Sequence, residues 1–386
     1  MKFEKKIILF AILIFLLSLI IYSYTFNNNI LDWDDDVYII KNDMIKDFSL
    51  NGIKRIFTSI YHCDYLPLTQ LSFLFDYHFW KLNPVGYHLT NSLFHAANAL
   101  LVFILFSMIF GDPFIGAFSS FFFIIHPLNV ESVAWITERK TVLSIFFLLI
   151  AFIFFIKYIK KDKKRYYTLS LISYIFACLA KSLVVVFPFL LLLYEICFIR
   201  DKIKLKNKIP FFILGIATAL MAIYTQGRAE AIKPYHGGSL SNTFMGMSII
   251  VMEYFKKLVL PLGLNCRYPN IFVIGYHAFS KAMVLVIAIA VASFFSFKRN
   301  RIIFFCFGWF FISFAPVSNI IPIANMMADR YMYLPSLSLF ALAGLGFKKL
   351  WDRFPFFTLR SILAFLFIIY SIFLITLSID RTKVWR

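Results

Sequence analysis

The chain has 386 residues, of which 61% are hydrophobic and 20% aromatic, while only 15% carry a charge. Its 50 phenylalanines and repeated apolar runs of about 18 residues exclude an ordinary water-soluble domain and predict an all-α protein that crosses a membrane many times. The net charge of +19 would suit a nucleic-acid-binding protein, but the positions of the charges argue against that class.

Apolar runs that could form membrane-spanning helices recur along the whole chain. The first, IILFAILIFLLSLIIYSY, follows a basic start. It is too long for a signal peptide and no small-residue cleavage site follows it, so we interpret it as a retained helix. The predicted spans, about eleven, are 7–25, 89–110, 114–126, 141–157, 167–180, 183–199, 209–225, 279–297, 302–317, 334–347 and 358–379.

The charges between these runs predict the orientation. With a cytoplasmic N-terminus, the short inner segments hold 21 Lys and Arg against 6 Asp and Glu, and the longer outer segments hold 18 against 14. Basic density is therefore higher inside, as the positive-inside rule requires. We expect a multi-pass protein of the cytoplasmic (inner) membrane that contacts membrane lipids and binds no nucleic acid.

Two outer loops, 26–88 and 226–278, are too long to be simple connections. Both mix apolar and polar residues at helical spacing, which is typical of helices lying in the membrane interface. We predict one membrane domain over residues 1–386, with these helices walling a cavity open to lipid and water. No soluble C-terminal domain is expected. Cys63 and Cys266 both fall outside, and the sequence leaves a disulfide between them open.

Charged and polar residues gather in several segments predicted to lie on the outer face. The acidic run of Asp34, Asp35 and Asp36 directly follows the first helix. Later segments contribute His126, Glu131, Lys181, Arg267, Asp329 and Arg330, with Arg139 and Lys140 as further candidates.

These residue types suit a transferase whose leaving group is a lipid-anchored phosphate. A carboxylate, for which we favour Asp34 or Asp35, would take a proton from an acceptor hydroxyl as it attacks a sugar carbon. Arginine and lysine would stabilise the negative charge that develops on the phosphate. The sequence leaves open whether a divalent cation binds the aspartates, since hard cations prefer oxygen ligands.

The second predicted span carries a polar face. His88, Asn91, His95 and Asn98 follow one another at spacings of 3, 4 and 3 and so share one side of a helix. They would tie helices together by hydrogen bonds or line the donor pocket. A metal site of His88 and His95 is disfavoured, because about two helical turns separate them.

Several candidates also have a purely structural interpretation. The acidic run could be a solvated helix flank. His126, which precedes Pro127, could simply end a helix. Lys181 could be a snorkelling anchor, and Arg330 could pair with Asp329 or another acid.

Six segments together resemble one family. In chain order they are WDDDVYIIKN, DYLPLTQLSFLFDYHFWKLNPVGYHLTNSLFHAANALLVF, HPLNVESVAWITERKTVLS, AKSLVVVFPFLLLLYE, VLPLGLNCRYPN and PVSNIIPIANMMADRYMYLPS. From about residue 30 to the end, the chain is similar to bacterial relatives of the transmembrane and tetratricopeptide-repeat O-mannosyltransferases, in the GT-C superfamily.

The resemblance implies a GT-C fold and an inverting glycosyltransferase that uses a polyprenyl-phosphate-linked sugar. The acceptor would be a protein or glycolipid hydroxyl on the outer face. The family's acidic pair matches Asp34 and Asp35, with Asp36 as an extra neighbour. Its His-Pro and Glu motif, its basic turn and its Arg-Tyr motif match His126, Pro127 and Glu131, then Lys181, then Arg330 and Tyr331.

Many family members continue into tetratricopeptide repeats, whereas this chain ends at its last predicted helix. We therefore expect an acceptor-binding arm that is missing, shortened or supplied by a separate partner. Two other classes stay open: a transporter or flippase for a lipid-linked sugar or small solute, and a non-catalytic scaffold that binds polyprenyl phosphate. Transport would favour buried midplane charges and paired halves, which the sequence does not show.

Overall fold

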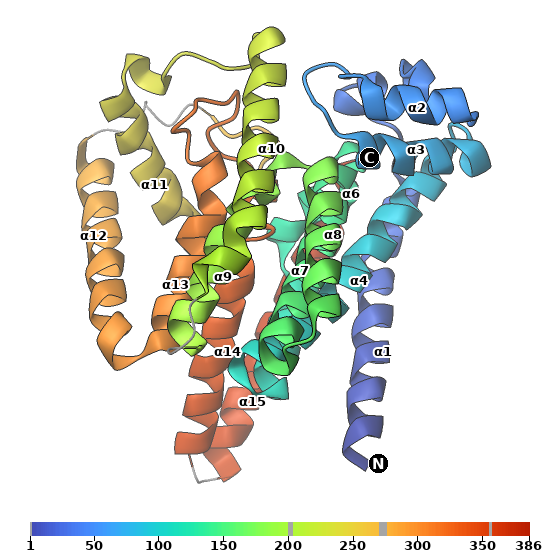
Figure 1. Ribbon diagram of the computed structural model, residues 1–386. Helices are drawn as coiled ribbons and strands as arrows, with labels where there is room; N and C mark the ends of the chain where they lie inside the picture. Colours follow the sequence, from blue (N-terminus) through green and yellow to red (C-terminus); the bar gives the residue numbers. More distant parts are fainter. Residues whose placement is uncertain (1, 200–203, 270–275, 355–356) are drawn as a thin grey trace.

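The computed structural model describes residues 2–199, 204–269, 276–354 and 357–386 (Figure 1). The described residues form helices joined by turns and loops and contain no β-sheet. The α-helices are α1 (Lys2–Tyr22), α2 (Leu50–Thr58), α3 (Pro67–Trp80), α4 (Pro84–Phe110), α5 (Pro113–Ile125), α6 (Val130–Ala134), α7 (Arg139–Lys161), α8 (Lys164–Ala180), α9 (Phe187–Phe198), α10 (Ile209–Arg228), α11 (Leu240–Val259), α12 (Tyr276–Arg299), α13 (Arg301–Phe314), α14 (Ser336–Arg353) and α15 (Phe357–Lys383).

The predicted class, an all-α polytopic membrane protein, is confirmed. Each predicted apolar run falls on a helix. Within the described residues, six helices are long and apolar enough to cross a membrane, and a seventh results if α5 and the helical segment after it, bent by 64°, form one span. The apolar helices Ser182–Phe198 and Arg301–Val317 are shorter. The number of eleven spans therefore stays a prediction.

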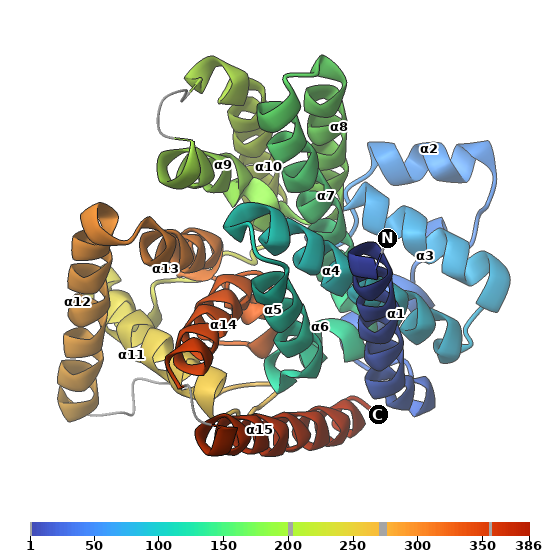
Figure 2. The ribbon, with the colours of Figure 1, turned by 90° about the horizontal axis from the view of Figure 1, so that it is seen from below.

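The long helices run side by side, and the two chain ends lie at opposite ends of the bundle (Figure 1). We call the end that carries α2, α3, α6 and the C-terminus the loop-rich end. Seen along the bundle, α15 lies along one side, next to α14 and α1, while α11 and α12 lie at another edge (Figure 2). Helices α4 and α5 lie near the centre of this view, and together with α7 they contribute much of the main apolar core.

The break between α5 and α6 positions the segment that will carry the site. His126 ends α5 with an extended backbone, and its Nδ1 accepts a hydrogen bond from the Leu128 amide 3.3 Å away. Pro127 cannot continue the helical hydrogen bonds, so the chain turns and starts α6 in a new direction. Glu131, at the start of α6, is thereby placed at the loop-rich end.

The polar face of α4 holds this segment in place. The Asn91 side-chain amide donates to the Val133 and Trp135 carbonyls at 3.2 Å, and the Asn98 amide donates to the Val142 carbonyl at 2.9 Å. Both side chains are fully buried, where unpaired amides would be costly. These hydrogen bonds fix the start of α7 against α4.

Candidate functional site

The three consecutive aspartates have different environments and different partners. Asp34 is about half exposed, at 48%, and lies 3.6 Å from the Lys140 ammonium. Asp36 forms an ion pair with the exposed Lys41. Asp35 is fully buried and has no cationic partner among the described residues. The run is therefore not a uniform solvated flank.

Asp35 acts as a strut between two backbone segments. One carboxylate oxygen accepts the Thr137 amide at 2.9 Å, and the other accepts the Leu31 amide at 3.2 Å. Burial raises the pKa of Asp35 to about 6, although these hydrogen bonds oppose the shift. The residue fixes the short helix Ile136–Glu138 over the end of the bundle.

Glu138 lies at the centre of the site. Its side chain is 1% exposed and faces three cations: the Lys181 ammonium at 3.0 Å, Arg330 Nε at 3.4 Å and the Lys140 ammonium at 3.9 Å. The Thr141 hydroxyl also donates to it. We call Glu138 with Lys140, Lys181 and Arg330 the Glu138 cluster.

Arg330 is held on several sides. Its guanidinium pairs with Glu131, and its backbone amide donates to the same carboxylate at 3.1 Å. The group also lies over the rings of Trp135 and Tyr331, at 5.3 and 5.0 Å from their centroids. Arg330 thus forms the ion pairs that the structural interpretation predicted, and its partners are Glu131 and Glu138. Its other form, a pair with Asp329, is wrong.

Asp329 has different partners. It accepts the Tyr268 hydroxyl at 2.5 Å and pairs with Arg381 at 3.2 Å. Its pKa is raised, first by burial and then by the charge of Glu131. Asp329 thereby ties the loop before α12 and the end of α15 to the segment that carries Arg330.

The Glu138 cluster has three cations, and one of the acids that face them, Asp34, is half exposed to solvent beside Lys140. Its three cations face two buried carboxylates, Glu131 and Glu138, and their side chains keep 11–19% exposure. Burial lowers the pKa of Lys181, as expected for an ammonium held away from water. Lys181 uses two donors, on Glu138 and Thr141, and an ammonium has three. The cluster can therefore bind a further anion.

The remaining predicted residues lie apart from this cluster. His126 is fully buried, its Nε2 bonds the Leu258 carbonyl at 3.2 Å, and its ring packs on Phe340. His95 bonds the Tyr333 hydroxyl at 2.8 Å inside the bundle, and His88 is also fully buried on α4. Arg267 lines a separate polar pocket. Their roles in substrate binding stay predictions.

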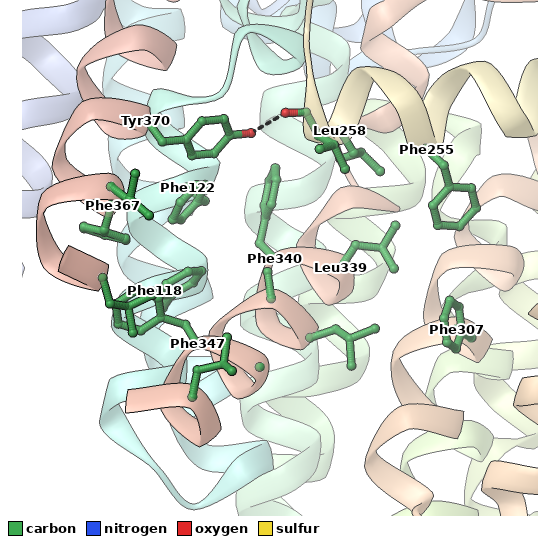
Figure 3. Close-up of a pocket in the computed structure, with 17 residues that line it drawn as sticks. Phe118, Phe122, Phe255, Leu258, Phe307, Leu339, Phe340, Phe347, Phe367 and Tyr370 are labelled. Atoms are coloured by element: carbon green, nitrogen blue, oxygen red, sulfur yellow. Dashed lines mark hydrogen bonds between the residues drawn. The ribbon is translucent and has the colours of Figure 1, made fainter. Parts of the chain in front are cut away.

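The structure also has two apolar cavities that bear on lipid binding. The larger, of 680 Å³, lies between α5, α11, α14 and α15 and is lined by phenylalanine and leucine side chains (Figure 3). Tyr370 closes one edge by donating to the Val259 carbonyl at 2.7 Å. The smaller, of 220 Å³, lies between α8 and α10, and its polar lining includes Asp64 and Ser182, the residue after Lys181.

The structure contains neither the disulfide nor a metal-ligand group among its described residues. All five cysteines are free: Cys63 lies 4.0 Å from the Tyr38 hydroxyl, and Cys266 lies 3.9 Å from Arg381. The disulfide that the sequence left open is therefore absent. No three His, Cys, Asp or Glu side chains of the described segments converge as metal ligands would.

Comparison with known proteins gives the family context. No family model matches the chain. Its homologues are named protein O-mannosyl-transferases. Tmtc3 of Drosophila melanogaster is 24% identical over 379 residues, covering 76% of this chain and 41% of that protein. F38B6.6 of Caenorhabditis elegans is 26% identical over 345 residues, covering 82% and 48%. Human TMTC3 is 36% identical over 92 residues, covering 24% and 10%.

The chain thus spans about half, or less, of the curated relatives it matches. The similarity agrees with the O-mannosyltransferase resemblance of the sequence motifs. The bacterial branch and the GT-C superfamily stay predictions.

Sequence reasoning missed Glu138 as the centre of the site. The residue stands in ITERK, where an acid before a long apolar run is typical of a helix start. Its two basic neighbours, Arg139 and Lys140, were the available signal. The two side chains lie in different places, since Arg139 is fully buried against Asp76 while Lys140 reaches the cluster.

Proposed function

We propose that this chain is an inverting membrane glycosyltransferase that moves a sugar from a polyprenyl-phosphate donor to an acceptor hydroxyl at the loop-rich end. The relatives' names indicate mannose as the sugar. The observation that carries the proposal is the convergence of Lys140, Lys181 and Arg330 on Glu138, with the half-exposed Asp34 beside Lys140.

The cluster would hold the donor phosphate. Glu138 keeps three cations close together that would otherwise repel one another, and their spare donors can bind phosphate oxygens. Donors fixed before the reaction stabilise charge as it develops and need no rearrangement. Arg330, clamped by Glu131 and two aromatic rings, is especially rigid.

Asp34 would be the general base, and Asp35 the residue that positions the site. Asp34 would take the proton of the acceptor hydroxyl while the oxygen of that hydroxyl bonds to the sugar's anomeric carbon. The bond from that carbon to the phosphate oxygen breaks, and the phosphate leaves with the electron pair. Lys140 contacts both Asp34 and Glu138, so it links the base to the phosphate site.

Substitution of Asp34 tests the proposal most directly. In reconstituted protein with a polyprenyl-phosphate sugar, we expect Asp34→Asn to lower kcat about 100-fold or more and to leave donor binding unchanged. Asp36→Asn is the matched control, because the one ion pair of Asp36 among the described residues is with the exposed Lys41, and we expect an effect of less than about threefold. Equal effects of the two substitutions would contradict the assignment of the base.

The smaller cavity would hold the isoprene units nearest the phosphate, because it begins beside Lys181. The larger cavity is separated from Arg330 by a packed apolar cluster that includes Leu128, Leu258 and Met332. Two exposed alanines offer a matched test, since Ala217 lines the smaller cavity and Ala343 the larger one. We expect Ala217→Trp to raise the donor KM severalfold and Ala343→Trp to leave it unchanged. The reverse result would place the donor lipid in the cavity of Figure 3.

A further inference from the structure

A polar pocket of 550 Å³ lies at the loop-rich end, next to the segment that carries Arg330. It is formed by residues 265, 267–269 and 324–327 together with His236. Two of its walls are tied to the neighbours of Arg330. Tyr268 donates its hydroxyl to Asp329 at 2.5 Å, and the Tyr331 hydroxyl donates to the Asn325 carbonyl at 3.2 Å. A ligand in this pocket would therefore be one residue layer from the Glu138 cluster.

The pocket has a positive lining. Arg267 contributes an exposed guanidinium, and no carboxylate lines the pocket among the residues that the structure describes. Behind the wall, the Lys257 ammonium lies over the Tyr268 ring, 5.2 Å from its centroid, and is held by the Leu262 and Gly263 carbonyls at 3.0 Å. The acid closest to the wall, Asp329, is already paired with Arg381.

We propose that this pocket binds an acidic side chain of a peptide acceptor, so that a nearby serine or threonine hydroxyl reaches the Glu138 cluster. The inference rests on the proposed function and names the substrate class of that site. An arginine fork matches a carboxylate with two parallel hydrogen bonds. Asn265 and Asn325 add polar groups for a peptide backbone, and Met326 and Met327 add an adaptable apolar surface.

A peptide fits this pocket better than a lipid-anchored acceptor does. Among the residues that the structure describes, the lining is mainly polar and includes no phenylalanine or leucine, whereas both apolar cavities described above are lined by leucine or phenylalanine. A lipid tail would require such an apolar wall, because it gains its free energy by leaving water.

Three peptides that differ only beside one central threonine test the proposal. The neighbouring residues are glutamate, glutamine or lysine, and the protein is the full chain in nanodiscs with a polyprenyl-phosphate mannose donor. We expect the glutamate peptide to have a KM about tenfold or more below that of the glutamine peptide, as for a charge-assisted hydrogen bond. Arg267→Glu should reverse the order in favour of lysine. Lys54→Glu, an exposed charge reversal on α2, is the control that should change nothing.

Direct peptide binding, measured without donor, separates the two proposals. Tighter binding of the glutamate peptide that is lost in Arg267→Glu would support the acidic acceptor even if no sugar moved, and absent transfer to any acceptor would then contradict the proposed function alone. Transfer or binding with no charge preference would overturn the acidic acceptor and leave the glycosyltransferase standing. Transfer to an anionic glycolipid but to none of the peptides would overturn the proposal that the acceptor is a peptide.

Discussion

Two ionic groups lie at opposite ends of α9, and they differ in how far they are open to solvent. Lys181 precedes this helix and belongs to the Glu138 cluster, whereas Glu195, in its last turn, pairs with Lys208 at 2.6 Å. The Glu195–Lys208 pair is fully buried, with one cation and one acid. The Glu138 cluster sets three cations against the buried Glu131 and Glu138 and the half-exposed Asp34, and it keeps part of its surface in contact with solvent.

This difference separates a structural pair from the proposed binding site. A balanced, sealed pair has neither charge nor room to offer a ligand, and its removal as a pair is often neutral or stabilising. A cluster that is open to solvent and has spare donors gains by binding an anion. The central acids alone do not separate the two groups, because Glu138 and Glu195 are equally buried.

Substitution of the central acids should break this comparison most clearly. We expect Glu138→Gln to lower sugar transfer more than 100-fold, because the three cations lose the charge that holds them together. Glu195→Gln should leave an uncompensated lysine and lower the free energy of unfolding by about 3 kcal/mol or more, with normal transfer per folded molecule. Transfer assays corrected for the folded fraction check both outcomes. An equal loss of transfer in both variants would mean that the two groups are not different in kind.

Replacement of the two lysines should make the difference between the two ionic groups clearer. Lys181→Met removes a phosphate donor, and we expect the donor KM to rise about tenfold or more with little change in stability. In the other group, Glu195→Leu combined with Lys208→Met should keep both activity and stability, because an apolar pair can replace a sealed ion pair. Thermal unfolding and donor titration would show whether the double substitution of the sealed pair leaves stability and donor binding unchanged.

The buried Asp35 gives a smaller, pH-dependent effect. Its pKa is about 6 in the folded chain against an ordinary value of 3.8, so the folded state holds the proton more tightly. The contribution of Asp35 to the free energy of unfolding is therefore largest below about pH 4. It falls as the pH rises to about 6, by about 3 kcal/mol at most. In Asp35→Asn this loss should disappear. Thermal midpoints of both proteins in detergent, measured from pH 4 to 7, would contradict the raised pKa of the buried Asp35 if their difference did not change with pH.

The aspartate run shows how far local pattern reaches. The sequence placed three acids after the first helix and named Asp34 and Asp35 together as base candidates. It had no means of separating them, because adjacent identical residues have the same local chemistry. The backbone amide of Thr137, about a hundred positions away, makes Asp35 a strut and leaves Asp34 half exposed.

Arg330 and Glu138 show the same limit from the opposite side. Arg330 was identified by its motif, but its partner could not be read from proximity in the chain, since the adjacent Asp329 pairs elsewhere. Glu138 looked like an ordinary acid at a helix start, and only its cations give it another meaning.

The sequence by itself determined the helices and the membrane class, because the length and spacing of apolar residues act locally on the backbone. It also determined which residue types stand in the motifs shared with O-mannosyltransferases. The tertiary structure alone decided which charges meet, which are sealed and which stay open to a ligand. Ion pairing depends on distances of a few ångströms between segments far apart in the chain, and no local pattern encodes those distances.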